Sequence, residues 1–164
     1  MNDPRIRAAV ITVTDTRRAD NDVSGDKVKE LLTSLGAEII SRQIATDDLT
    51  LLTELLRSLA ERDDINFIVT TGGTGFGPRD NTPEATRAVI EREAPGIGEA
   101  MRRQTSAKTP MAMLSRGICG IRGETLIINL PGSPKAVAEC FEVIRPVLQH
   151  AIDLLSGDSR HESS

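Results

Sequence analysis

A glycine-rich loop that ends in an aspartate is the part of this chain best suited to chemistry. Three glycines fall within residues 72–75, Gly77 follows, and Asp80 stands two residues before Thr82. Glycines let backbone amides approach a ligand without a Cβ in the way, and a loop between a strand and a helix N-terminus favours an anion such as phosphate. No Gly-Lys-Ser/Thr ends the loop and the third glycine of a dinucleotide fingerprint is missing, so neither standard nucleotide motif applies. The loop indicates a phosphate site, with a tight structural turn as the alternative.

Two acids stand at corresponding places along the chain. Asp80 closes the glycine loop, and Asp47 follows the second expected strand. Because ligands of parallel sheets bind beyond the carboxyl ends of the strands, we expect both acids at one rim. Two carboxylates beside a phosphate imply Mg²⁺, since unshielded they would repel the anion. The structural alternatives are a loop carboxylate bonded to nearby amides for Asp80 and a helix N-cap for Asp47, a task that Asp48 could also perform.

A second polar turn lies at residues 129–135. Asn129 ends an apolar run there, and Ser133 precedes a long helical pattern. The turn suits a second anion, with an ordinary strand–helix connection as the alternative. Ser115 and Arg116 precede an expected hairpin without a local structural need for either, and a solvent-exposed pair is the default interpretation.

Segments with strand and helix patterns alternate along the chain. The expected strands cover residues 8–13, 37–44, 65–71, 117–122 and 125–130, and the expected helices cover residues 25–35, a leucine-rich segment around 51–59, and residues 82–92, 98–105 and 133–155. Ser24 and Thr82 are expected as N-caps of the first and third helices. This alternation predicts an α/β fold with three layers, α/β/α, a mainly parallel sheet and a C-terminal hairpin.

Composition excludes several classes of function. The 164 residues suit one domain, expected at residues 1–156 with a flexible tail at 157–164. A net charge of −4 and the absence of Trp and Tyr argue against nucleic-acid binding, which relies on basic surfaces and aromatic stacking. Two cysteines and two histidines provide no zinc-ligand spacing. With isolated cysteines, no signal segment and no apolar run of membrane length, we expect a cytoplasmic protein.

Four motifs of the chain are distinctive: TGGTGFGPRDNTPEA at residues 71–85, DVSG at 22–25, LSR at 114–116 and NLPGSP at 129–134. They resemble those of the molybdenum cofactor biosynthesis family, which contains the bacterial Mog and MoaB proteins and the G domains of gephyrin and its plant counterpart. They follow the family's order, and the resemblance extends over residues 7–155. The stretch from residues 121–123 through residues 136–140 is especially similar to the G-domain branch.

The resemblance implies a molybdopterin adenylyltransferase, in which molybdopterin and ATP give adenylylated molybdopterin and pyrophosphate with Mg²⁺. It also implies a homotrimer and delivery of the product to the downstream molybdenum-insertion protein. The composition adds the expectation of no nucleic-acid and no membrane partner. A molybdopterin-binding paralogue without catalysis and a scaffold domain are the alternatives. The presence of both Asp47 and Asp80 favours the enzyme.

The resemblance also implies roles for individual residues. Asp47 and Asp80 match the two essential acids and are the expected Mg²⁺ ligands. The expected nucleotide and phosphate residues are Ser24, Gly25, Gly72, Gly73, Thr74 and Gly75, and the expected pterin residues are Thr105, Ser115, Arg116, Asn129, Pro131, Gly132 and Ser133. Thr105 departs from the family, whose members usually have serine there.

Overall fold

The computed structural model describes residues 5–157. Residues 158–164 of the expected tail lie outside this range. The elements, in chain order, are β1 (Arg7–Val13), α1 (Val23–Ser34), β2 (Glu38–Ala45), α2 (Leu49–Ala60), β3 (Phe67–Thr71), α3 (Thr82–Val89), β4 (Arg92–Glu93), α4 (Pro95–Ser106), the 3₁₀ helix η1 (Pro110–Leu114), β5 (Cys119–Arg122), β6 (Thr125–Leu130) and α5 (Pro134–Leu155). None of the helices within residues 5–157 combines the length and apolar character that crossing a bilayer requires.

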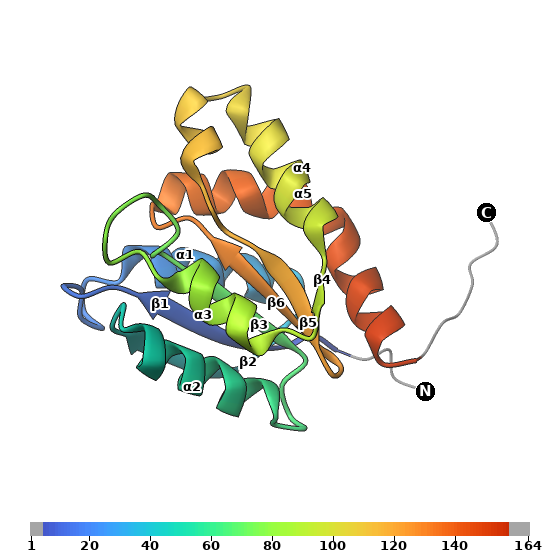
Figure 1. Ribbon diagram of the computed structural model, residues 1–164. Coiled ribbons are helices and arrows are strands. Elements are labelled where there is room, and N and C mark those ends of the chain that lie inside the picture. Colours follow the sequence, from blue (N-terminus) through green and yellow to red (C-terminus); the bar gives the residue numbers. More distant parts are fainter. Residues whose placement is uncertain (1–4, 158–164) are drawn as a thin grey trace.

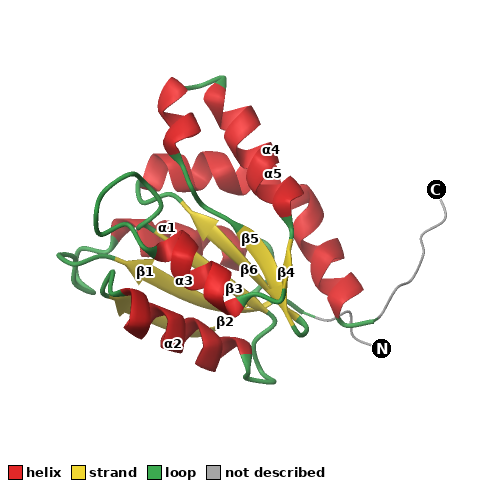
Figure 2. Cartoon of the chain, in the orientation of Figure 1, coloured by secondary structure: helices red, strands yellow, loops and turns green. Residues whose placement is uncertain are grey.

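The six strands form one mainly parallel sheet in the order β2-β1-β3-β6-β5-β4. β2, β1, β3 and β6 pair in parallel, whereas β5 and β4 run antiparallel to their neighbours. The β5–β6 hairpin turns at Gly123, whose φ is +56°. The loops that follow β1, β3 and β6 gather at one end of the sheet (Figure 2). The predicted α/β fold with its C-terminal hairpin is confirmed.

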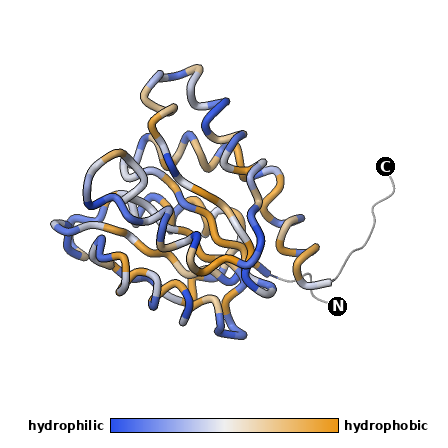
Figure 3. The backbone as a smooth tube through the Cα atoms, viewed as in Figure 1, coloured by the Kyte–Doolittle hydropathy of each residue, from blue (hydrophilic) through white to orange (hydrophobic). Residues whose placement is uncertain are grey.

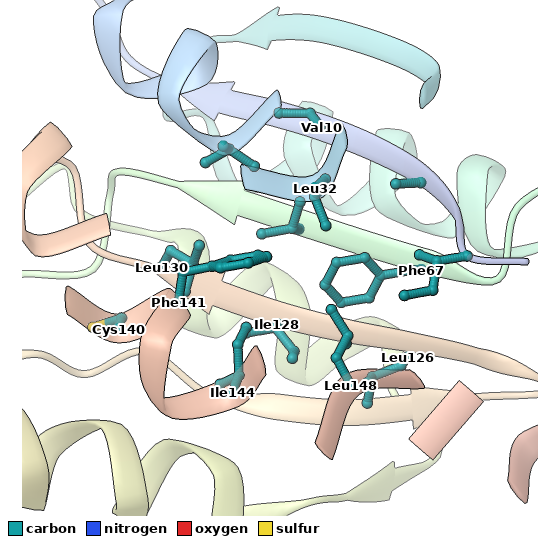
Figure 4. Packing of buried hydrophobic residues seen from close by; sticks show 14 of the residues in the cluster. Val10, Leu32, Phe67, Leu126, Ile128, Leu130, Cys140, Phe141, Ile144 and Leu148 are labelled. Atoms are coloured by element: carbon teal, nitrogen blue, oxygen red, sulfur yellow. The ribbon is translucent and has the colours of Figure 1, made fainter. Parts of the chain in front are cut away.

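Helices cover both faces of the sheet and complete three layers. α2 and α3 lie on one face and α1 and α5 on the other (Figure 1). Successive strand side chains point to opposite faces, so Val10 joins the core under α1 and α5 and Ile11 joins the core under α2 and α3. Phe67 and Phe141 fill the first of these cores (Figure 4). The central strands β1, β3 and β6 are mostly apolar along their length (Figure 3), as burial on both faces requires.

Two helix starts differ from the expectation. The N-cap of α1 is Asp22, whose carboxylate accepts the Gly25 N–H at 3.0 Å, and not Ser24. Thr82 is the first residue of α3 and not its cap. Each hydroxyl has a partner outside its helix: Ser24 Oγ donates to the carbonyl of Gly132, and Thr82 Oγ1 donates to that of Gly72. Both hydroxyls therefore donate to carbonyls outside their helices and do not act as N-caps.

The third helix is shorter than predicted. It ends at Val89, and not near residue 92, because Ile90 is extended with φ −67° and ψ 147°. The chain then forms β4, which the sequence analysis missed, and the N–H of Glu91 donates to the carbonyl of Ile121 at 2.8 Å. Pairing with β5 has therefore overridden the helix propensity of residues 90–92. The next helix, α4, begins at Pro95, which is earlier than expected.

Candidate active site

The glycine loop between β3 and α3 depends on backbone angles that glycine adopts without strain. Gly72 and Gly73 have φ values of +97° and +68°. Thr82 ties the loop to α3, because its Oγ1 donates to the Gly72 carbonyl at 2.9 Å and its N–H donates to the Gly73 carbonyl at 3.1 Å. A Cβ on Gly73 would lie 2.2 Å from Thr82 Oγ1 and 2.8 Å from Asp47 Oδ2. The loop is both a tight turn and a close neighbour of the Asp47 carboxylate.

Asp47 is buried between the glycine loop and the start of α2. Its Oδ1 accepts the N–H of Asn81 at 2.9 Å, and the Asn81 side chain donates to the Asp47 carbonyl at 3.0 Å. The N-cap of α2 is Asp48 instead, whose carboxylate accepts the Leu51 N–H. Burial raises the pKa of the Asp47 carboxyl, the Asn81 hydrogen bond opposes this rise, and the negative charges of Asp80 and Asp15 add to it. Asp47 is therefore not the N-cap of α2, which was the structural alternative to a functional role.

Asp80 lies against the other end of the same loop. Its Oδ2 accepts the Gly77 N–H at 2.8 Å and would lie 2.9 Å from a Cβ on Gly75. Asp80 is therefore held by the loop itself, whereas Asp47 reaches the loop from the end of β2. The structure brings the two acids to one loop, as the parallel-strand rule predicted.

The two carboxylates fit a Mg²⁺ ion that is shared with a phosphate. Asp47 and Asp80 each use one oxygen for a loop N–H, and the other oxygen of each has no hydrogen bond within residues 5–157. In this part of the chain, no group of three or more His, Cys, Asp or Glu side chains could hold a metal alone. Mg²⁺ commonly takes one or two carboxylates together with substrate phosphates and water. The donor set therefore suits a cation that arrives with a phosphorylated ligand.

An ion pair that the sequence analysis missed borders this acid pair. Asp15, from the loop after β1, accepts the Asp47 N–H at 3.1 Å and pairs with Arg79 at 2.8 and 3.1 Å. The Arg79 guanidinium lowers the pKa of the Asp15 carboxyl below its usual value. Arg79 thus places a positive charge at this edge of the sheet, close to Asp15, Asp47 and Asp48. It was not considered because its partner stands 64 residues away in the sequence.

A cleft of about 410 Å³ opens beside the glycine loop, within the usual size range of small-molecule pockets. The loop and Asp80 form one wall, and α4, η1 and the first turns of α5 form the others. Apolar contact comes from Met101, Met111 and Leu114, and no Phe lines the cleft. A heterocycle would be held between aliphatic and thioether side chains, since the chain has neither Trp nor Tyr.

Most of the predicted pterin residues line this cleft. They are Thr105, Ser115, Asn129, Pro131, Gly132 and Ser133, joined by Gly73, Thr74 and Gly75 of the predicted nucleotide set. Ser133 is the N-cap of α5, so its Oγ accepts the Ala136 N–H at 3.1 Å. The N-terminus of that helix, which favours negative charge, borders the cleft.

Asn129 lines the cleft, but its side chain forms hydrogen bonds within the protein. Its Oδ1 accepts the Ile118 N–H at 3.1 Å, and its Nδ2 donates to Thr70 Oγ1 at 3.0 Å and Thr86 Oγ1 at 2.9 Å. These bonds join β6, β3, α3 and the chain before β5. Asn129 therefore stabilises the floor of the cleft, and its amide is already in use.

The remaining nucleotide candidates lie toward a second hollow of about 330 Å³. Gly72 lines it together with Arg17, Gly132, Ser133 and threonines that follow or end β1 and β3. Ser24 stands beside it, since its Oγ donates to Gly132 and accepts from Arg17. Gly25 lets the Asp22 carboxylate fold over α1, because a Cβ there would lie 2.1 Å from Asp22 Oδ2. The cleft and the second hollow share Gly132 and Ser133, so the two spaces adjoin.

Arg116, predicted as a pterin residue, does not line the cleft but fastens the glycine loop. Its Nε donates to the Gly75 carbonyl and its Nη2 to the Asp80 carbonyl, both at 2.7 Å, and its Nη1 donates to Glu84. Its own N–H donates to the Thr74 carbonyl at 2.8 Å. Arg116 therefore positions Asp80 and the loop, and its guanidinium is occupied by the protein.

We expect Arg116→Lys to lower kcat for a reaction at this site about tenfold or more while leaving the KM of the ligand that occupies the cleft within about threefold. A lysine cannot reach three separate acceptors, and small misplacements of a reacting group are costly. Steady-state kinetics checks this split, with Arg87→Lys as the control because Arg87 lies outside the cleft, forms an exposed pair with Glu93 and keeps its charge as lysine. A selective rise in that KM would instead show that Arg116 contacts the ligand, as the sequence predicted.

Two charged residues that line the cleft were missed by the sequence analysis. Arg102 of α4 lies one helical turn before Thr105, and its Nη1 donates to the Gly117 carbonyl at 2.7 Å. Glu139 of α5 stands three residues after Ala136, which also lines the cleft. Helical spacing would have indicated both, because Arg102 is three residues from Thr105 and Glu139 is two steps of three residues from Ser133.

The fold and the site define a class of protein: α/β domains with a mainly parallel sheet, which bind small molecules in a cleft beyond the carboxyl ends of their strands. This chain belongs to the family described as "Probable molybdopterin binding domain", whose model matches residues 9–150. It is 37% identical over 157 residues to a molybdopterin adenylyltransferase of Helicobacter pylori strain J99, covering 93% of this chain and 89% of that protein. It is 42% identical over 157 residues to the molybdenum cofactor synthesis protein cinnamon of Drosophila melanogaster, again over 93% of this chain but only 26% of that longer protein. The solved structure of the molybdopterin biosynthesis enzyme MoaB from Thermus thermophilus superposes with a TM-score of 0.85 at 43% identity, covering 93% of this chain and 97% of that one.

Proposed function

We propose that this chain is a molybdopterin adenylyltransferase, which transfers AMP from ATP to molybdopterin and releases pyrophosphate. Relatives that carry this name or the name MoaB match most of the chain. The observation that carries the proposal is the meeting of Asp47 and Asp80 at one glycine loop, beside a cleft large enough for a pterin. A binding module or a scaffold would have no need of two such acids.

The two adjoining spaces suit the two substrates. Molybdopterin would occupy the cleft, with its phosphate toward the N-terminus of α5 and residues 73–75. ATP would lie in the second hollow, near Ser24, Gly72 and Arg17. An oxygen of the molybdopterin phosphate then attacks the α-phosphorus of ATP, a new P–O bond forms, and the bond from that phosphorus to the bridging oxygen breaks as pyrophosphate leaves. Such a reaction needs alignment and charge stabilisation more than covalent participation by the protein.

The loop and the acids divide these tasks. Backbone amides of the glycine loop orient the phosphates without side-chain obstruction. Asp47 and Asp80 would hold Mg²⁺, which when bound neutralises charge on the triphosphate. Arg79 beside them supplies a fixed positive charge near the same rim. Arg116 keeps Asp80 in place.

The proposal includes a homotrimer that passes its product to the downstream molybdenum-insertion protein. An apolar groove of about 510 Å³ between α4 and α5 supports association, because exposed Val147 and Leu154 line it. Contiguous exposed apolar surface of this kind commonly marks an interface.

Pyrophosphate release tests the activity directly. We expect the purified protein to release pyrophosphate when molybdopterin, ATP and Mg²⁺ are all present, and we expect chelation by EDTA to abolish release until Mg²⁺ is restored. The physical reason is that two carboxylates and a triphosphate repel one another without a cation. Absence of release, with molybdopterin binding intact, would favour the non-catalytic paralogue.

A further inference from the structure

Glu139 places a carboxylate in the cleft at a distance from the acids already described. It stands on the second turn of α5 and is half-buried, among the residues that line the cleft. Within residues 5–157, its carboxylate accepts no hydrogen bond and forms no ion pair. A carboxylate that keeps contact with solvent and has no protein partner can accept hydrogen bonds from a ligand. The group is therefore available to a ligand.

The position of Glu139 corresponds to the far end of a bound heterocycle. Ser133, at the start of α5, lines the cleft with residues 73–75 of the glycine loop, where the reacting phosphate would sit, and its neighbour Gly132 lies against Gly72. Six residues of helix place Glu139 about 9 Å further along the axis. A fused ring system spans that length, and Met101 and Met111 supply apolar walls for its faces. The edge of the ring remote from the phosphate would then meet Glu139.

The pyrimidine edge of a pterin is complementary to a carboxylate. Its ring N3–H and its 2-amino group point the same way, so they can donate two parallel hydrogen bonds to the two carboxylate oxygens. The other charged groups in the cleft are unsuited to this edge. Arg102 is itself a donor and is bound to the Gly117 carbonyl, and Asp80 belongs to the glycine loop.

We propose that Glu139 is the specificity-determining residue of the cleft and selects 2-amino-4-oxopteridines by accepting from N3–H and the 2-amino group. This inference rests on the proposed function for the orientation of the ligand. It assigns a recognition role that neither the acids of the glycine loop nor the predicted pterin residues perform.

Two probes that differ in the group at position 2 of the ring test this assignment. 6-Hydroxymethylpterin carries the amino group, and 6-hydroxymethyllumazine carries an oxygen that the carboxylate would repel. We expect the wild-type protein to bind the pterin at least about 30-fold more tightly, measured by fluorescence titration. Glu139→Gln, in which the amide can donate to the lumazine oxygen, should reduce this preference to within about threefold. In turnover, the same variant should raise the KM for molybdopterin and leave kcat and the KM for ATP unchanged.

Glu142→Gln is the matched control. Glu142 lies on the same helix outside the cleft, in an exposed pair with Arg145. The Glu142→Gln protein should therefore prefer the pterin as strongly as the wild type does. An unchanged preference in Glu139→Gln would overturn the proposal, as would an equal loss of affinity for both probes. A Glu139-dependent preference without pyrophosphate release would refute the adenylyltransferase and retain this inference. Pyrophosphate release without a Glu139-dependent preference would refute this inference and retain the adenylyltransferase.

Discussion

Asp80→Asn should reduce adenylyl transfer about 100-fold or more while ATP and molybdopterin still bind within a few-fold of wild type. The asparagine side chain can still accept the Gly77 N–H, so the loop keeps its geometry. What is lost is a negative charge at the point where a cation and the triphosphate would meet, and losing one preorganised electrostatic element typically costs this much. Pyrophosphate release and equilibrium binding of each substrate measure the two effects separately.

The control for Asp80→Asn is the same chemical change at a remote site. Asp63→Asn removes one exposed charge from the turn before β3, away from the cleft, and should leave transfer unchanged. Full activity in Asp80→Asn would remove Asp80 from the mechanism. Loss of binding together with loss of transfer would instead make Asp80 a residue that maintains the cleft.

Gly73→Ala should abolish transfer and destabilise the fold by roughly 2–3 kcal/mol, from a left-handed alanine and a displaced hydrogen bond. The added methyl would lie 2.2 Å from Thr82 Oγ1 and 2.8 Å from Asp47 Oδ2. Both neighbours would have to move, and with them the bond from Thr82 to Gly72 and the position of the Asp47 carboxylate. Chemical denaturation and pyrophosphate release report the two losses.

Gly123→Ala separates backbone strain from the collision. Gly123 also has a positive φ, +56°, but a Cβ there would meet nothing within 4 Å. This variant should lose only about 1 kcal/mol of stability and keep full transfer. If Gly73→Ala behaved like Gly123→Ala in both assays, the close contact between the loop and Asp47 would have no functional role.

The approach of Asp47 to Asp80 was predictable because it follows from topology. Strand-like runs end just before Asp47 and before the glycine loop, and parallel strands bring their carboxyl ends to one edge. The choice between Asp47 and Asp48 as helix cap was not predictable. Either carboxylate could reach an early N–H of α2, and the backbone conformation at Asp48 decided it.

Side chains with distant partners were the least predictable. Arg116 was expected at the pterin, yet its acceptors are carbonyls 41 and 36 residues away and a carboxylate on α3. Glu139 and Arg102 enter the cleft only because α5 and α4 are packed with those faces toward it. No local pattern encodes such contacts, although helical spacing marks the faces that could make them.

Sequence alone therefore determined the order of the strands and helices apart from β4 and η1, the α/β class, the glycine loop and the edge at which the two acids meet. These features depend on apolar periodicity and on backbone angles, which are properties of a few neighbouring residues. Tertiary structure decided which hydroxyls cap helices, which arginine holds the loop, and which carboxylate remains free for a ligand. Those outcomes depend on competition among hydrogen-bond partners that lie far apart in sequence and meet only when the layers pack.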